Sequence, residues 1–156
     1  MKSVNSPLGG GGKVAIVTGG GSGLGFAIAQ KFTENGITTI IAGRDTEKLN
    51  KAKAQLGDLC HAISCDVSDL KTIPAFVQNV LTQFGQIDIL VNNAGINQKK
   101  EFTEVSDEEF QNIITTNVTA VFTMSREVVK HMLEKKSGCI INISSMAAQY
   151  GLPKVI

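Results

Sequence analysis

The alternation of short apolar runs with longer amphipathic stretches is the feature that most constrains this chain. Short runs rich in β-branched residues predict buried strands, and amphipathic stretches predict helices that cover a sheet. The expected strands are Val14–Thr18, Ile37–Ala42, Cys60–Ser64, Ile87–Asn92 and Cys139–Ser144. The expected helices are Leu24–Asn35, Thr46–Leu56, Ser68–Phe84 and Ser106–Lys136. This order predicts βαβ units, and therefore an α/β fold with a doubly wound parallel sheet.

The last expected helix carries the strongest local signals. Ser106 and Glu109 have the spacing of a capping box, in which each side chain bonds the backbone of the other residue. The apolar residues that follow share one helical stripe, formed by Phe110, Ile113, Ile114, Val118, Val121, Phe122, Val128, Val129 and Met132. We therefore expect a single continuous helix with one apolar face.

The 156 residues suffice for one domain, because a chain of this size buries enough surface for a stable core. Residues 1–12 hold four consecutive glycines and no apolar run, so we expect a flexible N-terminal tail and neither a signal peptide nor a membrane span. Residues 13–156 form the expected domain. Because a doubly wound sheet normally adds a sixth strand, we expect this domain to be incomplete, truncated after its fifth strand.

Charge and cysteine content argue against several classes of protein. Lys and Arg number 15 against 14 Asp and Glu, which gives no basic surface for nucleic acid or an anionic membrane. Cys60, Cys65 and Cys139 are odd in number and form no C-x-x-C pair. We therefore expect buried, reduced thiols in a cytoplasmic protein, with no metal site.

The segment Thr18–Gly25 reads TGGGSGLG and joins the first expected strand to the first expected helix. Glycines allow a sharp turn and a close approach to a ligand, and a helix N-terminus presents free N–H groups to an anion. Glycine is also common in ordinary turns, so the glycines alone are weak evidence. Their place between a strand and a helix of a βαβ unit predicts a site for the diphosphate of a dinucleotide.

The spacing of Gly19, Gly23 and Gly25 resembles the T-G-x-x-x-G-x-G motif of the short-chain dehydrogenase/reductase family. Further segments resemble motifs of that family in the same order: Asp66-Val67, Asn92-Asn93-Ala94-Gly95, Asn117 in a T-N-V context, and Ile143-Ser144-Ser145. The resemblance covers residues 13–156. It implies a Rossmann-type fold and an NAD(P)-dependent oxidoreductase that moves hydride between nicotinamide and a carbonyl or secondary alcohol.

The resemblance also bears on substrate and assembly. The stretch from Asn93 to Met146 is most similar to dehydrogenases of sugar acids and polyols, such as gluconate 5-dehydrogenase. Oxoacyl-carrier-protein reductases are the alternative. The implied partner is a small carbonyl or alcohol substrate, and full-length members of the family are commonly homodimers or homotetramers.

The resemblance implies a set of cofactor-binding residues at the carboxyl ends of the expected strands. They are Thr18, Gly19, Gly21, Ser22, Gly23, Leu24, Gly25, Arg44, Asp66, Val67, Asn93, Ala94 and Gly95. Asp66 would contact adenine, although Asp66 or Ser68 could instead cap the following helix. The N-N-A-G segment lies at a strand end, where an open α/β sheet binds its ligand, and a plain turn is the alternative.

The residues after the second expected strand indicate which nicotinamide cofactor is used. An NAD enzyme places an acidic residue there for the ribose 2′-hydroxyl, whereas this chain has Gly43. Arg44 follows, and its fixed positive charge suits a 2′-phosphate, so we favour NADP, with NAD as the alternative. Arg44 could instead be a solvated residue before the Thr46 helix, with Asp45 offsetting part of its charge.

Two residues are implied as catalytic, Asn117 and Ser145. In the family the asparagine holds a water in a proton relay, and the second serine of the pair bonds the substrate oxygen, so Ser144 is not expected to act. Asn117 falls on the apolar stripe, where a polar side chain is costly unless it is hydrogen-bonded, and a purely structural role is the alternative. Ser145 could equally be a turn former at a strand end.

Tyr150 and Lys154 imitate the Y-x-x-x-K pair of the family, in which a tyrosine assisted by a lysine donates a proton. Gly151 and Pro153 prevent the regular helix that would bring the two side chains together. The resemblance places the true pair beyond Ile156, so we expect this chain alone to bind cofactor and to be nearly inactive. A catalytically inactive nucleotide-binding module is therefore the second hypothesis.

Overall fold

The structure is a computed structural model that describes residues 12–155, and its strands form a five-stranded parallel sheet. The strands are β1 (Val14–Thr18), β2 (Thr38–Gly43), β3 (Cys60–Ser64), β4 (Ile89–Asn92) and β5 (Cys139–Asn142). Their order across the sheet is β3-β2-β1-β4-β5, and every neighbouring pair is parallel. The predicted α/β fold with a doubly wound parallel sheet is confirmed.

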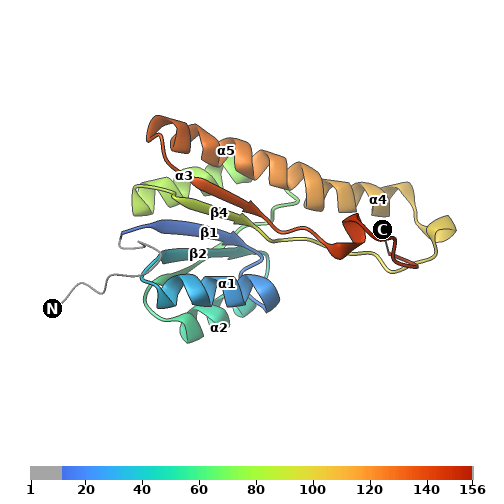
Figure 1. The fold of residues 1–156 in the computed structure, drawn as a ribbon, viewed down its shortest axis with the longest axis horizontal. Helices are drawn as coiled ribbons and strands as arrows, with labels where there is room; N and C mark the ends of the chain where they lie inside the picture. Colours follow the sequence, from blue (N-terminus) through green and yellow to red (C-terminus); the bar gives the residue numbers. More distant parts are fainter. Residues whose placement is uncertain (1–11, 156) are drawn as a thin grey trace.

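Helices cover both faces of the sheet (Figure 1). On one face lie α1 (Gly23–Glu34) and α2 (Thr46–Leu56), and on the other lie α3 (Ile73–Phe84) and α5 (Ala120–Glu134). A further helix, α4 (Asp107–Ile114), continues the line of α5 beyond the carboxyl edge of the sheet. The sheet is therefore the middle of three layers.

Two apolar clusters, one on each face, hold the layers together. Successive residues of a strand point to opposite faces. Ile16 of β1 therefore packs with Val80 and Val128 from α3 and α5, whereas Val17 packs with Ala29 and Leu49 from α1 and α2. This two-sided burial explains why β1 is an unbroken apolar run in the sequence.

The largest boundary error concerns α3, which begins at Ile73 and not at the expected Ser68. Two successive turns precede it, with backbone hydrogen bonds from Asp69 to Asp66 and from Thr72 to Asp69. Thr72 therefore precedes the helix, and neither Asp66 nor Ser68 is its N-cap. The other strand and helix ends that the sequence predicts differ by at most two residues, apart from the division of the last helix.

The expected continuous helix Ser106–Lys136 is divided in two. The Ser106 capping box is present as predicted, but a π-helical turn at Thr115–Thr119 separates α4 from α5. A π-helical turn contains more residues than an α-helical turn and so rotates the following residues about the helix axis. The single apolar stripe is therefore wrong. Of its residues, Ile113, Val128 and Met132 are buried, and Phe110, Val118 and Phe122 are exposed.

The three cysteines are free thiols. Cys60 and Cys65 are buried, and burial raises the pKa of each thiol to about 11. Cys139, the first residue of β5, is exposed, so the expectation that all three thiols are buried is wrong for this residue.

The expected flexible tail falls on residues 1–12, of which only Gly12 lies within the described range. Within residues 12–155, His, Cys, Asp and Glu side chains form no group of three or more that could hold a metal ion. Over the same residues, no helix is both long and apolar enough to cross a membrane.

Candidate cofactor-binding site

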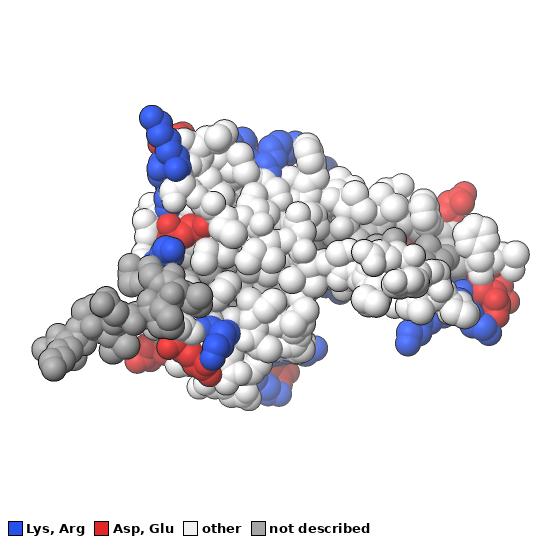
Figure 2. All heavy atoms as spheres, in the orientation of Figure 1, with Lys and Arg blue, Asp and Glu red and all other residues white. Residues whose placement is uncertain are grey.

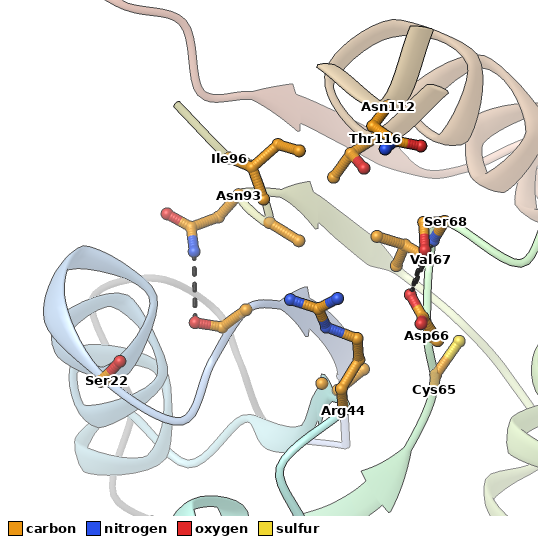
Figure 3. A pocket seen from close by; sticks show the side chains of 15 residues that line it. Ser22, Arg44, Cys65, Asp66, Val67, Ser68, Asn93, Ile96, Asn112 and Thr116 are labelled. Atoms are coloured by element: carbon orange, nitrogen blue, oxygen red, sulfur yellow. Dashed lines mark hydrogen bonds between the residues drawn. The ribbon is translucent and has the colours of Figure 1, made fainter. Parts of the chain in front are cut away.

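A cavity of about 590 Å³ opens at the carboxyl ends of the strands (Figure 3). The chain leaves β1 towards β2 on one side of the sheet and later returns to β4 on the other. Such a switch point is where open α/β sheets bind their ligands. The lining residues are Gly19, Ser22, Ala42, Gly43, Arg44, Cys65, Asp66, Val67, Ser68, Asn93, Ala94, Gly95, Ile96, Asn112 and Thr116.

The glycine turn between β1 and α1 has the backbone geometry that the sequence predicts. Gly19 adopts a φ of 66° and donates a 2.7 Å backbone hydrogen bond to the carbonyl of Ala42 at the end of β2. Ser22 is the N-cap of α1, and its side chain forms no capping hydrogen bond. The first N–H groups of a helix have no partner within the helix, so this turn can offer them to an anion.

Position 25 requires glycine, because its Cα lies close to Gly19 and to the side chain of Asn93. A Cβ atom at this position would overlap the carbonyl oxygen of Gly19 and would lie 2.5 Å from Nδ2 of Asn93. Any side chain here would push α1 away from the end of β1. Gly25 therefore acts from behind the cavity wall and does not line the cavity.

Thr18 and Asn93 join the carboxyl ends of β1 and β4. The Thr18 hydroxyl donates to the carbonyl of Val91 at 3.3 Å and accepts from the backbone N–H groups of Asn93 and Ala94, both at 3.0 Å. Nδ2 of Asn93 donates in return to the carbonyls of Thr18 at 3.0 Å and Gly19 at 3.3 Å. These long-range bonds fix the glycine turn against the N-A-G segment, so Thr18 shapes the site without lining it.

Arg44 lies on the cavity wall directly after β2 (Figure 3). Its neighbour Asp45 caps α2 by accepting a hydrogen bond of 2.9 Å from the backbone N–H of Lys48. Within the described residues Asp45 forms no ion pair with Arg44. The guanidinium is therefore available to an anionic ligand, and Gly43 brings no carboxylate to this wall.

The loop after β3 supplies a second part of the wall. One carboxylate oxygen of Asp66, Oδ1, accepts hydrogen bonds from the backbone N–H of Ser68 at 2.9 Å and from its hydroxyl at 2.7 Å. These bonds hold the loop in a local turn. Cys65 precedes it, and desolvation followed by the charges of Asp66 and Asp69 raises the pKa of its thiol, which argues against a reactive thiolate.

Asn117 lies in the π-helical turn and is exposed, so its expected burial on the apolar stripe is wrong. Its side-chain amide bonds both backbone groups of Ile96. Nδ2 donates to the Ile96 carbonyl at 2.8 Å, and Oδ1 accepts from the Ile96 N–H at 2.9 Å. Asn117 thus anchors the chain that follows Gly95, and its catalytic role stays a prediction.

Ser145 is exposed and precedes a short 3₁₀ turn, Met146–Ala148, where its hydroxyl accepts a hydrogen bond of 3.2 Å from the Ala147 N–H. Tyr150 follows the turn and is exposed. Lys154 has a φ of 61° and pairs with Glu101. Among the described residues after Ala148 there is no helix, so the expectation that Tyr150 and Lys154 do not form the helical pair is confirmed.

Some of the predicted site residues line the cavity and others do not. The predicted residues that line it are Gly19, Ser22, Arg44, Asp66, Val67, Asn93, Ala94 and Gly95. Those that do not are Thr18, Gly21, Gly23, Leu24, Gly25, Asn117 and Ser145. Sequence reasoning missed Asn112 and Thr116, although their spacing of four residues in a helix that reaches the strand ends could have indicated them.

The parallel sheet flanked by helices is a Rossmann-type α/β fold with a cavity at its switch point. The sequence model of the short chain dehydrogenase family matches residues 13–156, and the chain therefore belongs to that family. Among its curated relatives, a 3α-hydroxysteroid dehydrogenase from Mediterraneibacter gnavus is 43% identical over 90% of this chain and 58% of its own length. A 3-oxoacyl-(acyl-carrier-protein) reductase from Haemophilus influenzae is 36% identical over 91% of this chain and 59% of its own.

Solved structures agree with the family assignment. A metagenomic short-chain oxidoreductase in complex with NADP matches with a TM-score of 0.88 and 34% identity, over 93% of this chain and 67% of the other. A variant actinorhodin polyketide ketoreductase with NADPH matches with a TM-score of 0.87 and 34% identity, over 91% and 56%. The chain thus spans a little over half the length of the curated relatives that it matches.

Proposed function

We propose that residues 13–156 are a dinucleotide-binding domain that holds NADP(H) in the cavity at the carboxyl edge. The observation that carries this proposal is the continuity of the cavity from the glycine turn to Arg44. An anion-binding helix start and a free guanidinium then line one wall, as a diphosphate and a 2′-phosphate require. Two neighbours of known structure were crystallised with NADP or NADPH, which supports the same cofactor here.

The proposed activity is hydride transfer between the cofactor and a carbonyl or secondary alcohol. When bound, the nicotinamide ring supplies the hydride chemistry. The residues of this chain bind and orient the cofactor. The glycine turn holds the diphosphate, and the segment Asn93–Ile96, anchored by Asn117, forms the wall at the end of β4. We assign to Ser145 the hydrogen bond to the substrate oxygen, because its hydroxyl is exposed after β5.

The substrate is proposed as a class, a small carbonyl or alcohol such as a sugar acid or polyol, in a protein that functions as a homodimer or homotetramer. The curated relatives name a hydroxysteroid and 3-oxoacyl groups, which favours an oxoacyl-carrier-protein reductase as the alternative substrate assignment. Exposed apolar side chains on α4, the π-helical turn and α5 support self-association. They are Phe110, Val118 and Phe122.

A second candidate is nucleotide binding without reduction. The observation that favours it is the arrangement of Tyr150 and Lys154, which lie on no common helix and so provide no proton donor pair. General acid catalysis contributes about 10²–10⁴-fold to a rate, so a domain without its acid would bind cofactor and turn over very slowly.

Titration calorimetry of the 156-residue chain with NADPH and NADH tests the proposal. We expect tighter binding of NADPH, and we expect Arg44→Ala to weaken NADPH about tenfold while NADH changes little, because charge-assisted hydrogen bonds to the 2′-phosphate are lost. Arg126→Ala is the matched control, since Arg126 pairs with Glu127 on α5 and does not line the cavity.

Absence of heat with both cofactors would contradict the site itself, and equal loss for both cofactors in Arg44→Ala would contradict the NADP preference. The rate of NADPH oxidation with a panel of ketones and oxoacyl thioesters separates the two candidate functions. Robust turnover by this chain would contradict the binding-only candidate.

A further inference from the structure

One end of the cavity is lined by polar side chains from two segments that are distant in the sequence. The loop after β3 contributes Asp66, Val67 and Ser68, and the helical segment around α4 contributes Asn112 and Thr116. Figure 3 shows Asn112 and Thr116 on the helix that passes over Val67 and Ser68. The inference below rests on the proposed dinucleotide site and concerns how that site selects the base.

The strand order determines which half of a dinucleotide reaches this end. The glycine turn follows β1 at the centre of the sheet, Arg44 and Asp66 follow β2 and β3 on one side, and Asn93 follows β4 on the other. A diphosphate held at the glycine turn therefore places one nucleoside over β2 and β3 and the other over β4. Arg44 next to the expected 2′-phosphate assigns the adenosine half to β2 and β3.

Asn112 has unused hydrogen-bonding capacity at this end of the cavity. Its side-chain amide forms no hydrogen bond with any residue in the described range, whereas the neighbouring Gln111 donates one of 3.3 Å to the Thr115 hydroxyl. Asp66 is partly occupied, because its Oδ1 already accepts two bonds from Ser68. Asn112 thus offers a complete donor and acceptor pair to a ligand in the cavity.

We propose that Asn112 is a specificity-determining residue that recognises the adenine base through its N6 amino group and N7. Adenine presents a donor at N6 beside an acceptor at N7, and an asparagine amide matches this pair with its oxygen and nitrogen. Hypoxanthine has a carbonyl oxygen in place of the amino group and so presents two acceptors. The amide can satisfy only one of them, and its own oxygen then faces another acceptor.

The test compares NADPH with its reduced hypoxanthine analogue in titrations of the 156-residue chain. We expect the parent chain to prefer NADPH, and we expect Asn112→Leu to weaken NADPH about tenfold while the analogue changes less than about threefold. The dissociation constant of the analogue divided by that of NADPH should therefore be smaller in Asn112→Leu than in the parent chain. Gln111→Leu is the matched control, because Gln111 lies next to Asn112 on the same helix, is also exposed and does not line the cavity.

Two results would overturn the inference while the proposed function stands. In the first, Asn112→Leu leaves both dissociation constants unchanged, so Asn112 does not contact the base. In the second, it weakens NADPH and the analogue equally, so the residue contributes no selectivity. If the parent chain itself does not bind NADPH, the proposed function fails and the inference fails with it. Thermal unfolding of each variant confirms that the domains compared are folded.

Discussion

Strands β1 and β5 each lead into a segment proposed to be functional, yet they differ sharply in burial. All five residues of β1 are buried, and the strand pairs with β2 on one side and β4 on the other. Among residues 12–155, β5 pairs only with β4, and three of its four residues are exposed. Figure 2 shows a broad uncharged surface around the position of β5, with charged side chains gathered towards the edges of the view.

This difference in burial distinguishes the residues proposed to bind cofactor from the serine proposed to contact substrate. The glycine turn after β1 is fixed by packing on both faces of the sheet and by the bonds between Thr18 and Asn93. Ser145 follows a strand that is open on its outer edge. The residues proposed to hold the cofactor are therefore preorganised, whereas the serine proposed to hold the substrate is not equally supported.

Hydrogen bonds anchor β5 at both of its ends. Asp88, just before β4, accepts a hydrogen bond of 2.7 Å from the Val14 N–H and pairs with Lys135 at the end of α5. Its backbone carbonyl accepts a bond of 2.9 Å from the Cys139 N–H. At the other end of the strand, Nδ2 of Asn92 donates to Oδ1 of Asn142 at 2.8 Å, and the Ile143 N–H donates to the Asn92 carbonyl at 2.9 Å. β5 is therefore tied to β4 at both ends, and the support that it lacks is on its outer edge.

The comparison between β1 and β5 is tested most strongly by truncating one isoleucine in each strand. We expect Ile16→Ala to lower the free energy of unfolding by about 2–5 kcal/mol, because Ile16 is fully buried and its removal leaves a cavity. Ile141→Ala should cost less than about 1 kcal/mol, since Ile141 is 39% exposed. Urea unfolding followed by circular dichroism measures both, and similar losses would contradict the difference between the strands.

The thiols provide a second test, because Cys139 lies in β5 and is exposed, whereas Cys60 and Cys65 are buried. Burial raises the pKa of Cys60 and Cys65 to about 11, so only about one thiol in a thousand is ionised at pH 8, and the thiolate is the reactive form. We expect Cys139 to react at least about 100-fold faster with a disulfide reagent. Cys60 and Cys65 should react in a slow phase, and the rate of this phase should increase as the pH rises towards 11. Cys139→Ser should remove the fast phase, and a single rate for all three thiols would contradict the assignment.

The smallest expected effect concerns the capping box of α4. The Ser106 N–H and then Lys100 hold the pKa of Glu109 below its ordinary value of 4.5. A carboxylate whose pKa is lower in the folded state stabilises the fold above that ordinary value, and this contribution is lost as the pH falls through the lowered pKa. We expect Glu109→Gln to flatten the acid limb of a stability profile below pH 4.5, with Glu108→Gln as control. An unchanged acid limb would contradict this role.

Much of the fold follows from local patterns. The order of strands and helices was predictable because burial on both faces makes β1 an apolar run and leaves no charged residue in β2, while helices show their own period. The capping box was predictable because Ser106 and Glu109 are only three residues apart. The start of α3 was not, because turns stabilised by backbone bonds from Asp69 and Thr72 carry no strong sequence signature.

The candidate site was predictable in its motifs and less so in its contacts. The glycine turn, Arg44 and Asp66 line one cavity, as expected for residues at neighbouring strand ends. The contacts of Asn117 were not predictable, because the π-helical turn directs its amide to the backbone of Ile96. A helical stripe assumes constant α-helical spacing, and an inserted residue in one turn invalidates that assumption.

The sequence by itself determined the element order and the glycine turn after β1, because hydrophobic period and the freedom of glycine are properties of short segments. Only the tertiary structure decided that Thr18 and Asn93 lock two strand ends together, and that Asn112 lies across the cavity from the loop after β3. These contacts join residues far apart in the chain. Their geometry depends on the strand order and on one π-helical turn, neither of which a local pattern specifies.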